Sequence, residues 1–174
     1  AFHAYASAVA ARHGGALVKT SGEAVMASFP DAVSAARAAW EMQVRADELR
    51  AAAPLGELAR IRVGVSYGRV IREDRLGGAD YFGNTVNTAA RLMRKAGGGG
   101  VLLSAAVLHD AAAKALLAGP WTARERHELK GFAQPLEALR PDARLYPRPA
   151  VQRMTAALRR LSDSVMRLLP AKPG

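Results

Sequence analysis

The chain contains no cysteine, few aromatic residues and no long apolar run. Without cysteine, neither a disulfide framework nor a thiolate metal site can form among its 174 residues, which favours a reducing compartment. A membrane helix needs roughly 20 consecutive apolar residues, and no segment approaches that length. Aromatic residues make up 6% of the chain and do not cluster on a predicted strand, as an RNA-stacking sheet would require. These absences favour a cytoplasmic protein without a nucleic-acid partner, and any membrane tether would belong to a longer parent protein.

Acidic residues are also scarce. The chain has 25 Lys and Arg residues against 15 Asp and Glu residues, a net charge of +10, and residues 1–22 contain no carboxylate side chain. This excess favours anionic partners such as nucleotides, nucleic acid or acidic lipid, although arginines on solvated helix surfaces explain it equally well. The chain begins with a helix-like segment at Ala1, without a methionine or a signal peptide, so we expect it to be part of a longer protein.

Apolar spacing and turn residues predict helices and strands in mixed order. The predicted elements are helix 2–12, a hairpin of strands 16–19 and 24–29, helix 31–53 capped by Asp31, one bent strand or two strands in 60–73, helix 84–96, strand 101–104, helix 105–117, and strands 122–129 and 136–140. Their alternation lacks the strict period of a doubly wound fold. We therefore predict an α+β sandwich in which helices cover a mainly antiparallel sheet.

The composition changes after Pro147 and Pro149. Apolar residues then step by three and four from Val151 to Leu168, which predicts a short basic amphipathic helix. This helix could dock on its own domain, pair with a partner helix or rest on acidic lipid. We therefore divide the chain into one domain at 1–146 and a proline-rich linker with a helix at 147–174.

Five polar residues suggest a ligand site. Asn87 and Arg91 lie four residues apart in a predicted helix, so both side chains point from one face. An amide beside a cation suits an anionic ligand, but bonds to nearby backbone or to a surface carboxylate would satisfy both groups as well. Asp80 precedes them on a predicted glycine-containing turn. Lys19 and Glu23 flank the predicted hairpin turn, where such residues are usually solvated, so only their occurrence with the other three favours a site.

Three segments together resemble the catalytic domain of class III adenylyl and guanylyl cyclases. They are KTSGE at 19–23, DYFGNTVNTAAR at 80–91 and LKGFAQPLE at 129–137, and they occur in the family's order. The segment VGVSYGRV at 63–70 is similar to the family's strand before the second motif. The resemblance runs from about residue 2 to about residue 146. It implies a ferredoxin-like cyclase-homology sandwich and a role in intracellular second-messenger signalling.

The resemblance also implies a role for each site residue. Lys19 and Asp80 would read the adenine edge as donor and acceptor, since guanine presents the opposite pattern. Asn87 would orient the ribose, Arg91 would hold the phosphates, and Lys130 would reach them from the third motif. The implied reaction is attack of the ribose 3′-hydroxyl of ATP on the α-phosphorus, which yields cyclic AMP and pyrophosphate.

The family's metal site is only partly matched. Two aspartates of the family hold two ions, Mg²⁺ or Mn²⁺, and the first lies on an opening strand that would precede Ala1. Glu23 stands at the second position in place of aspartate, followed by Ala24 where the family usually has glycine. The extra methylene moves the carboxylate by roughly 1.5 Å, an error that Mg²⁺ tolerates poorly. We therefore expect this chain to be inactive by itself.

The family works as head-to-tail homodimers whose sites are shared between subunits. The resemblance therefore implies ATP and a second copy as partners, with a fused or partner sensor domain. Two other functions stay open. A degenerate cyclase-homology domain that binds nucleotide or a partner for regulation is favoured by Glu23 and Ala24, and a basic RNA-binding α+β module is disfavoured by the low aromatic content.

Overall fold

The computed structural model describes residues 2–52, 61–75 and 78–142. The helices are α1 (Phe2–Arg12), α2 (Ala32–Ala52), α3 (Asn84–Lys95) and α4 (Ala111–Leu117), with a 3₁₀ helix at Ala105–His109. The strands are β1 (Ala16–Ser21), β2 (Ala24–Ser28), β3 (Val63–Val65), β4 (Ile71–Arg75), β5 (Gly78–Phe82), β6 (Val101–Ser104), β7 (Thr122–His127) and β8 (Leu136–Pro141). The predicted amphipathic helix after Pro149 lies outside the described residues. No helix in the described part is long and apolar enough to cross a membrane.

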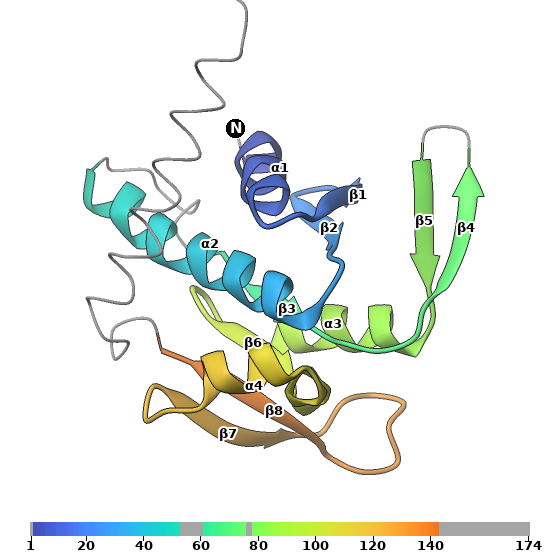
Figure 1. The fold of residues 1–174 in the computed structure, drawn as a ribbon, viewed down its shortest axis with the longest axis vertical. Coiled ribbons are helices and arrows are strands. Elements are labelled where there is room, and N and C mark those ends of the chain that lie inside the picture. Colours follow the sequence, from blue (N-terminus) through green and yellow to red (C-terminus); the bar gives the residue numbers. More distant parts are fainter. Residues whose placement is uncertain (1, 53–60, 76–77, 143–174) are drawn as a thin grey trace, which may run out of the picture. The chain divides into compact units, whose positions relative to one another are not determined.

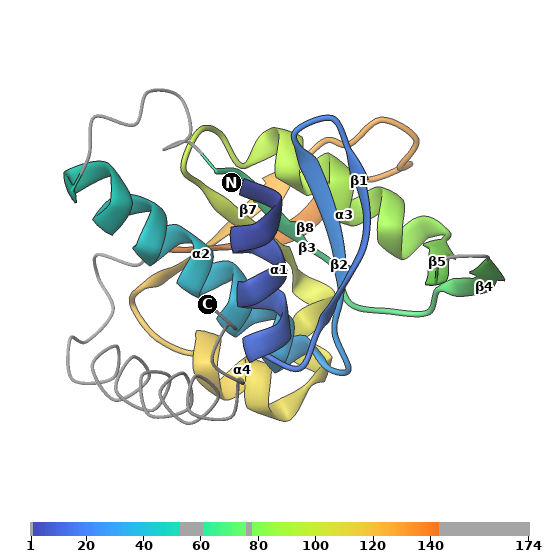
Figure 2. The same cartoon turned by 90° about the horizontal axis from the view of Figure 1, so that it is seen from above.

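The strands form one four-stranded sheet and two separate hairpins (Figure 1). The sheet has the order β3-β6-β8-β7, in which β3 runs parallel to β6 and the other neighbours are antiparallel. Strands β1 and β2 form one antiparallel hairpin, and β4 and β5 form the other (Figure 2). Helices and mainly antiparallel strands are thus combined as predicted, and the α+β fold class is confirmed.

Two clusters of buried side chains fix the positions of the helices and strands that carry the predicted site residues. The first lies between α1 and α2 and consists of Ala6, Val9, Ala38 and Met42, against which Val25 of β2 and Val63 of β3 pack. The second joins α3 to the sheet and consists of Leu92, Ala96, Leu102, Leu129 and Ala138. Full burial of one leucine side chain stabilises the fold by about 2 kcal/mol. The second cluster therefore fixes α3 over β6 and β8.

A glycine lets α3 approach β3 closely. A Cβ atom at Gly64 would lie 2.1 Å from the carbonyl oxygen of Ala89 and 2.3 Å from the backbone nitrogen of Met93. Such distances are impossible for any residue with a side chain, so the backbones of β3 and α3 can meet only with glycine at this position. Gly64 thereby sets the short distance between the backbones of α3 and β3.

One predicted helix and one predicted turn differ from the structure. The predicted helix 105–117 is wrong, because Asp110 divides it into the 3₁₀ helix and α4. The backbone of Asp110 is extended, and the Asp110 carboxylate accepts the N–H of Ala113 at 2.9 Å, as an N-cap residue does. The segment 60–73 contains β3 and the start of β4, which lie in different sheets, so the two-strand alternative predicted for it is confirmed. Asp80 is not on a turn as predicted but inside β5, where it pairs with Glu73 of β4.

A buried carboxylate links α1 to α2. Glu41 is 3% exposed, and its two oxygens contact Arg12 Nη2 at 2.5 Å and His13 Nε2 at 2.8 Å. Burial alone would raise the pKa of Glu41, but the hydrogen bonds and charges of His13 and Arg12 lower it below the usual 4.5. Because the pKa is depressed in the folded state, this stabilisation is present above the unfolded-state pKa and is lost as the pH falls through the folded-state pKa.

We expect Glu41→Gln to lower the free energy of unfolding at pH 7 by about 3 kcal/mol, because Arg12 and His13 would lose the carboxylate with which they pair in the protein interior. Below pH 4.5 the free energy of unfolding of the variant should fall less steeply with acidification than that of the parent, because the variant has no Glu41 carboxylate to protonate. Urea unfolding at pH 7 and at pH 4 measures both effects. The exposed Glu128→Gln serves as the control and should stay within about 0.5 kcal/mol of the parent. Equal unfolding free energies for Glu41→Gln and Glu128→Gln would contradict a stabilising role of the buried pair.

Candidate functional site

Lys19 and Asp80 come from different hairpins and meet in the structure. Lys19 Nζ donates to both carboxylate oxygens of Asp80, at 2.8 and 2.9 Å, across a separation of 61 residues. The ammonium also lies 5.0 Å from the ring centroid of Phe82. The Lys19 side chain is 46% exposed and that of Asp80 is 16% exposed. A donor and an acceptor therefore stand side by side where a ligand can reach them.

A β-bulge precedes Lys19 in β1. The register shifts between Leu17, which is opposite Ala27, and Lys19, which is opposite Met26. An extra residue in one strand bends it and changes the direction of the following side chain. The contact between β1 and β5 then brings Lys19 to Asp80. Asp80 is held in turn, because its Oδ1 accepts the N–H of Tyr81 at 2.8 Å.

Arg91 lies against the turn between β7 and β8. Its guanidinium carbon is 5.4 Å from the ring centroid of Phe132, within the range of a cation–π interaction. The N–H of Phe132 donates to the carbonyl of Leu129 at 3.1 Å, which closes a tight turn with Lys130 and Gly131 in its middle. Lys130 is exposed. The structure therefore brings Arg91 to the turn that carries Lys130.

The side chains of Asn87 and Glu23 do not contact the other predicted site residues through hydrogen bonds or ion pairs in the described part of the chain. Asn87 is exposed on α3, and its backbone N–H donates to the Gly83 carbonyl at 3.1 Å. Glu23 is exposed in the two-residue turn between β1 and β2. Within the described ranges, no hydrogen bond or ion pair links either side chain to Lys19, Asp80 or Arg91.

The described residues do not form a metal centre on their own. No group of three or more His, Cys, Asp or Glu side chains in residues 2–52, 61–75 and 78–142 is placed to hold an ion. Glu23 is a single exposed carboxylate, whereas Mg²⁺ takes near-octahedral oxygen coordination. This part of the chain therefore fits one ligand position and not a two-metal site.

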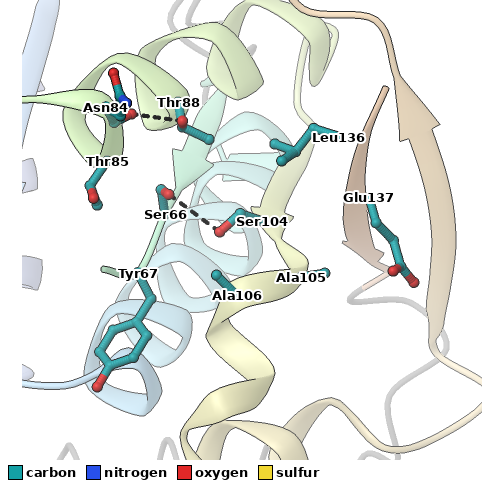
Figure 3. A pocket seen from close by; sticks show the side chains of 10 residues that line it. All are labelled: Ser66, Tyr67, Asn84, Thr85, Thr88, Ser104, Ala105, Ala106, Leu136 and Glu137. Carbon is teal, nitrogen blue, oxygen red and sulfur yellow. Dashed lines mark hydrogen bonds between the residues drawn. The ribbon is translucent and has the colours of Figure 1, made fainter. Parts of the chain in front are cut away.

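The structure also contains a small pocket. It has a volume of about 270 Å³ and opens between the carboxyl ends of β3 and β6 and the start of α3 (Figure 3). Two of its hydroxyl groups donate within the protein: Ser104 Oγ donates to Ser66 Oγ at 3.3 Å, and Thr88 Oγ1 donates to the Asn84 carbonyl at 2.7 Å (Figure 3). None of the predicted site residues lines it. Four of them are exposed, namely Lys19, Glu23, Asn87 and Lys130, whereas Asp80 and Arg91 are partly buried.

Residues 3–137 match the family model described as the Adenylate and Guanylate cyclase catalytic domain. This match covers most of the chain, which therefore belongs to that family. The resemblance carried by the three motifs is confirmed.

Curated relatives and solved structures agree with this assignment. The uncharacterized protein Rv2212 of Mycobacterium tuberculosis is 41% identical over 145 residues, which is 79% of this chain and 32% of the relative. Putative adenylate cyclase 3 of Rhizobium meliloti is 35% identical over 92 residues, 53% of this chain and 15% of that protein. The Adenylate/Guanylate Cyclase/Hydrolase structure from Silicibacter pomeroyi is 27% identical with a TM-score of 0.64, over 77% of this chain and 74% of that one. The chain thus spans about a third or less of the length of these two curated relatives.

Two aromatic residues at the site were not predicted from the sequence. Phe82 lies beneath the ammonium of Lys19, and Phe132 lies against the guanidinium of Arg91. Each follows a predicted site residue by two positions, Asp80 in one case and Lys130 in the other. The cations that contact them, Lys19 and Arg91, are 63 and 41 residues away in the sequence, so these pairings depend on the fold.

Proposed function

We propose that this chain is the catalytic domain of an adenylyl cyclase, which converts ATP to cyclic AMP and pyrophosphate in intracellular signalling. The observation that carries the proposal is the contact between Lys19 and Asp80 on the exposed surface of two hairpins. The adenine edge presents an acceptor, N1, beside a donor, the exocyclic amine. An ammonium and a carboxylate at hydrogen-bond distance from each other provide the complementary pair.

The remaining residues act on the sugar and the phosphates. Asn87, exposed on α3, orients the ribose by hydrogen bonds to its hydroxyl groups. Arg91 stabilises the charge that develops as the 3′-oxygen attacks the α-phosphorus and the bond to pyrophosphate breaks. Lys130 binds the phosphates from the neighbouring turn. Positioning and charge stabilisation supply most of the rate in such reactions.

The site is completed by a second copy of the chain in a head-to-tail homodimer. Lys19, Asn87 and Lys130 are exposed, and no residue of the proposed site lines the pocket of Figure 3, as expected for one half of a shared site. Glu23 belongs to the opposite half, where it supplies one ligand position for Mg²⁺ or Mn²⁺. A second ligand would come from an opening strand before Ala1. The domain at 1–146, with the linker and predicted helix at 147–174, is then cytoplasmic and works with a fused or partner sensor domain.

We expect purine preference to depend on Asp80. The test uses an extended chain, in which an opening strand with its aspartate precedes Ala1. This chain should prefer ATP over GTP, and Asp80→Ala should lower the ratio of the two kcat/KM values by about tenfold or more, because a hydrogen bond to a charged group is lost. Steady-state kinetics with both nucleotides measure the ratio.

The control for this test is Asp74→Ala. Asp74 lies on the same hairpin, where its exposed carboxylate pairs with Arg72 at 2.8 Å, and its removal should leave the ratio unchanged. Equal turnover of ATP and GTP by the unmutated extended chain would contradict the adenine assignment.

A second candidate function is regulation without catalysis, in which a degenerate cyclase-homology domain binds nucleotide or a partner. The lone carboxylate of Glu23 at the position of a metal aspartate favours it. An extended chain that binds ATP but forms no cyclic AMP with Mg²⁺ or Mn²⁺ would support this function over the enzyme.

A further inference from the structure

We infer that the turn Leu129–Phe132 positions Arg91 for an anionic ligand, with the ring of Phe132 and the backbone of Gly131 holding its guanidinium. The inference rests on the proposed function only where the anion is named as a triphosphate. In this role Phe132 is a positioning residue that touches Arg91 and not the substrate.

The guanidinium has contacts on this turn from two successive residues. Its carbon lies 5.4 Å from the ring centroid of Phe132. Both of its terminal nitrogens lie next to Gly131, where a Cβ atom would be 3.4 Å from each. An arginine side chain loses much rotamer freedom when it is held in one place. Contacts made before the ligand arrives reduce the entropy that ligand binding must still remove.

The turn itself is well anchored. The hydrogen bond from the Phe132 N–H to the Leu129 carbonyl closes it at 3.1 Å, and Gly131 has φ of +83°, as the third position of a type II turn requires. Leu129 is 5% exposed, and Phe132 packs on the same buried cluster as Leu129. That cluster also contains Leu92, the neighbour of Arg91 in α3, so the helix and the turn share one support.

An aromatic ring holds an arginine without consuming its donors. A carboxylate partner would neutralise the guanidinium and accept its N–H groups, whereas a ring face attracts the cation and leaves the five N–H donors at its edge free. Within the described residues, Arg91 has no carboxylate partner. The exposed Lys130 adds a second cation to the same turn. This combination suits an anion with several oxygens, such as a triphosphate.

The test is an NMR titration of the 174-residue chain with inorganic triphosphate, observed at the side-chain Nε–Hε signal of Arg91. In the parent, this signal should be displaced by the ring current of Phe132. In Phe132→Leu the displacement should vanish and triphosphate should bind about fivefold more weakly, the equivalent of about 1 kcal/mol. Phe132→Tyr retains the ring face and should restore both values.

The matched control is Phe29→Leu, the same change in the cluster beneath α1 and α2, which should alter neither value. If Phe132→Leu does not fold, Phe132→Met takes its place, since it keeps an apolar side chain without a ring. Absence of the ring-current displacement in the parent, or unchanged triphosphate affinity in Phe132→Leu, would overturn the inference. If an extended chain forms no cyclic AMP but the titration behaves as expected, the proposed function fails and this inference stands.

Discussion

Arg91→Ala in the extended chain should lower kcat by about 10²-fold or more, with a smaller change in KM. A guanidinium that stabilises developing phosphate charge contributes more in the transition state than in the ground state, so its loss reduces kcat. Its place beside the turn that carries Lys130 gives it a fixed position for this task. Steady-state kinetics with ATP at saturating metal measure both constants.

The control for Arg91 is Arg94→Ala. Arg94 is an exposed arginine in the last turn of the same helix, and its removal changes the net charge equally. We expect its kcat to stay within about twofold of the parent, since surface substitutions away from a site have small effects. An unchanged kcat with a raised KM in Arg91→Ala would show that the arginine binds substrate and transition state equally, contrary to its assigned role.

Mixing two inactive variants should restore activity if each site is shared between two copies. Glu23→Gln and Arg91→Ala, made separately in the extended chain, would each inactivate both sites of a homodimer. In a heterodimer of the two, one site receives both substitutions and the other receives neither. With random pairing, half of the dimers are mixed and one of their two sites is intact, so about a quarter of the parent activity should return.

The control for complementation combines two variants of the same half-site, Asn87→Ala and Arg91→Ala. Each site of that heterodimer contains one substitution, so activity should stay at the level of the separate variants. Mixed dimers must be shown to form, for example by co-purification of differently tagged chains. Absence of recovery in mixed dimers of Glu23→Gln and Arg91→Ala would contradict the shared site.

Local sequence chemistry determined most of the elements. Apolar spacing and turn residues predicted α1, α2, α3 and the β1–β2 hairpin, because periodicity and turn conformation depend on residues close together in the chain. Asp31 caps α2 as predicted, since its carboxylate accepts the N–H of Ser34 at 2.7 Å, a bond that lowers the pKa of Asp31. The three motifs were sufficient to identify the family.

Two local predictions were wrong, one because of a local capping bond and the other because of pairing with another strand. Apolar spacing favoured one helix over 105–117, but the capping bond of Asp110 divides it. The glycine in the stretch DYFG suggested that Asp80 lay on a turn, whereas residues Gly78 to Phe82 pair with β4 in a ladder. A ladder of this kind depends on a partner strand, and a single segment does not reveal its partner.

Only the tertiary structure decided which side chains meet. Lys19 and Asp80 are 61 residues apart, and their contact depends on a bulge in β1 and on the packing of β1 against β5. Arg91 reaches Phe132 because Gly64 lets α3 lie close to β3 while a buried cluster ties α3 to the β7–β8 turn. The sequence by itself determined the chemical identity of the site residues and the family. The distances between the site side chains follow from packing between elements that are far apart in the sequence, and local propensities do not encode that packing.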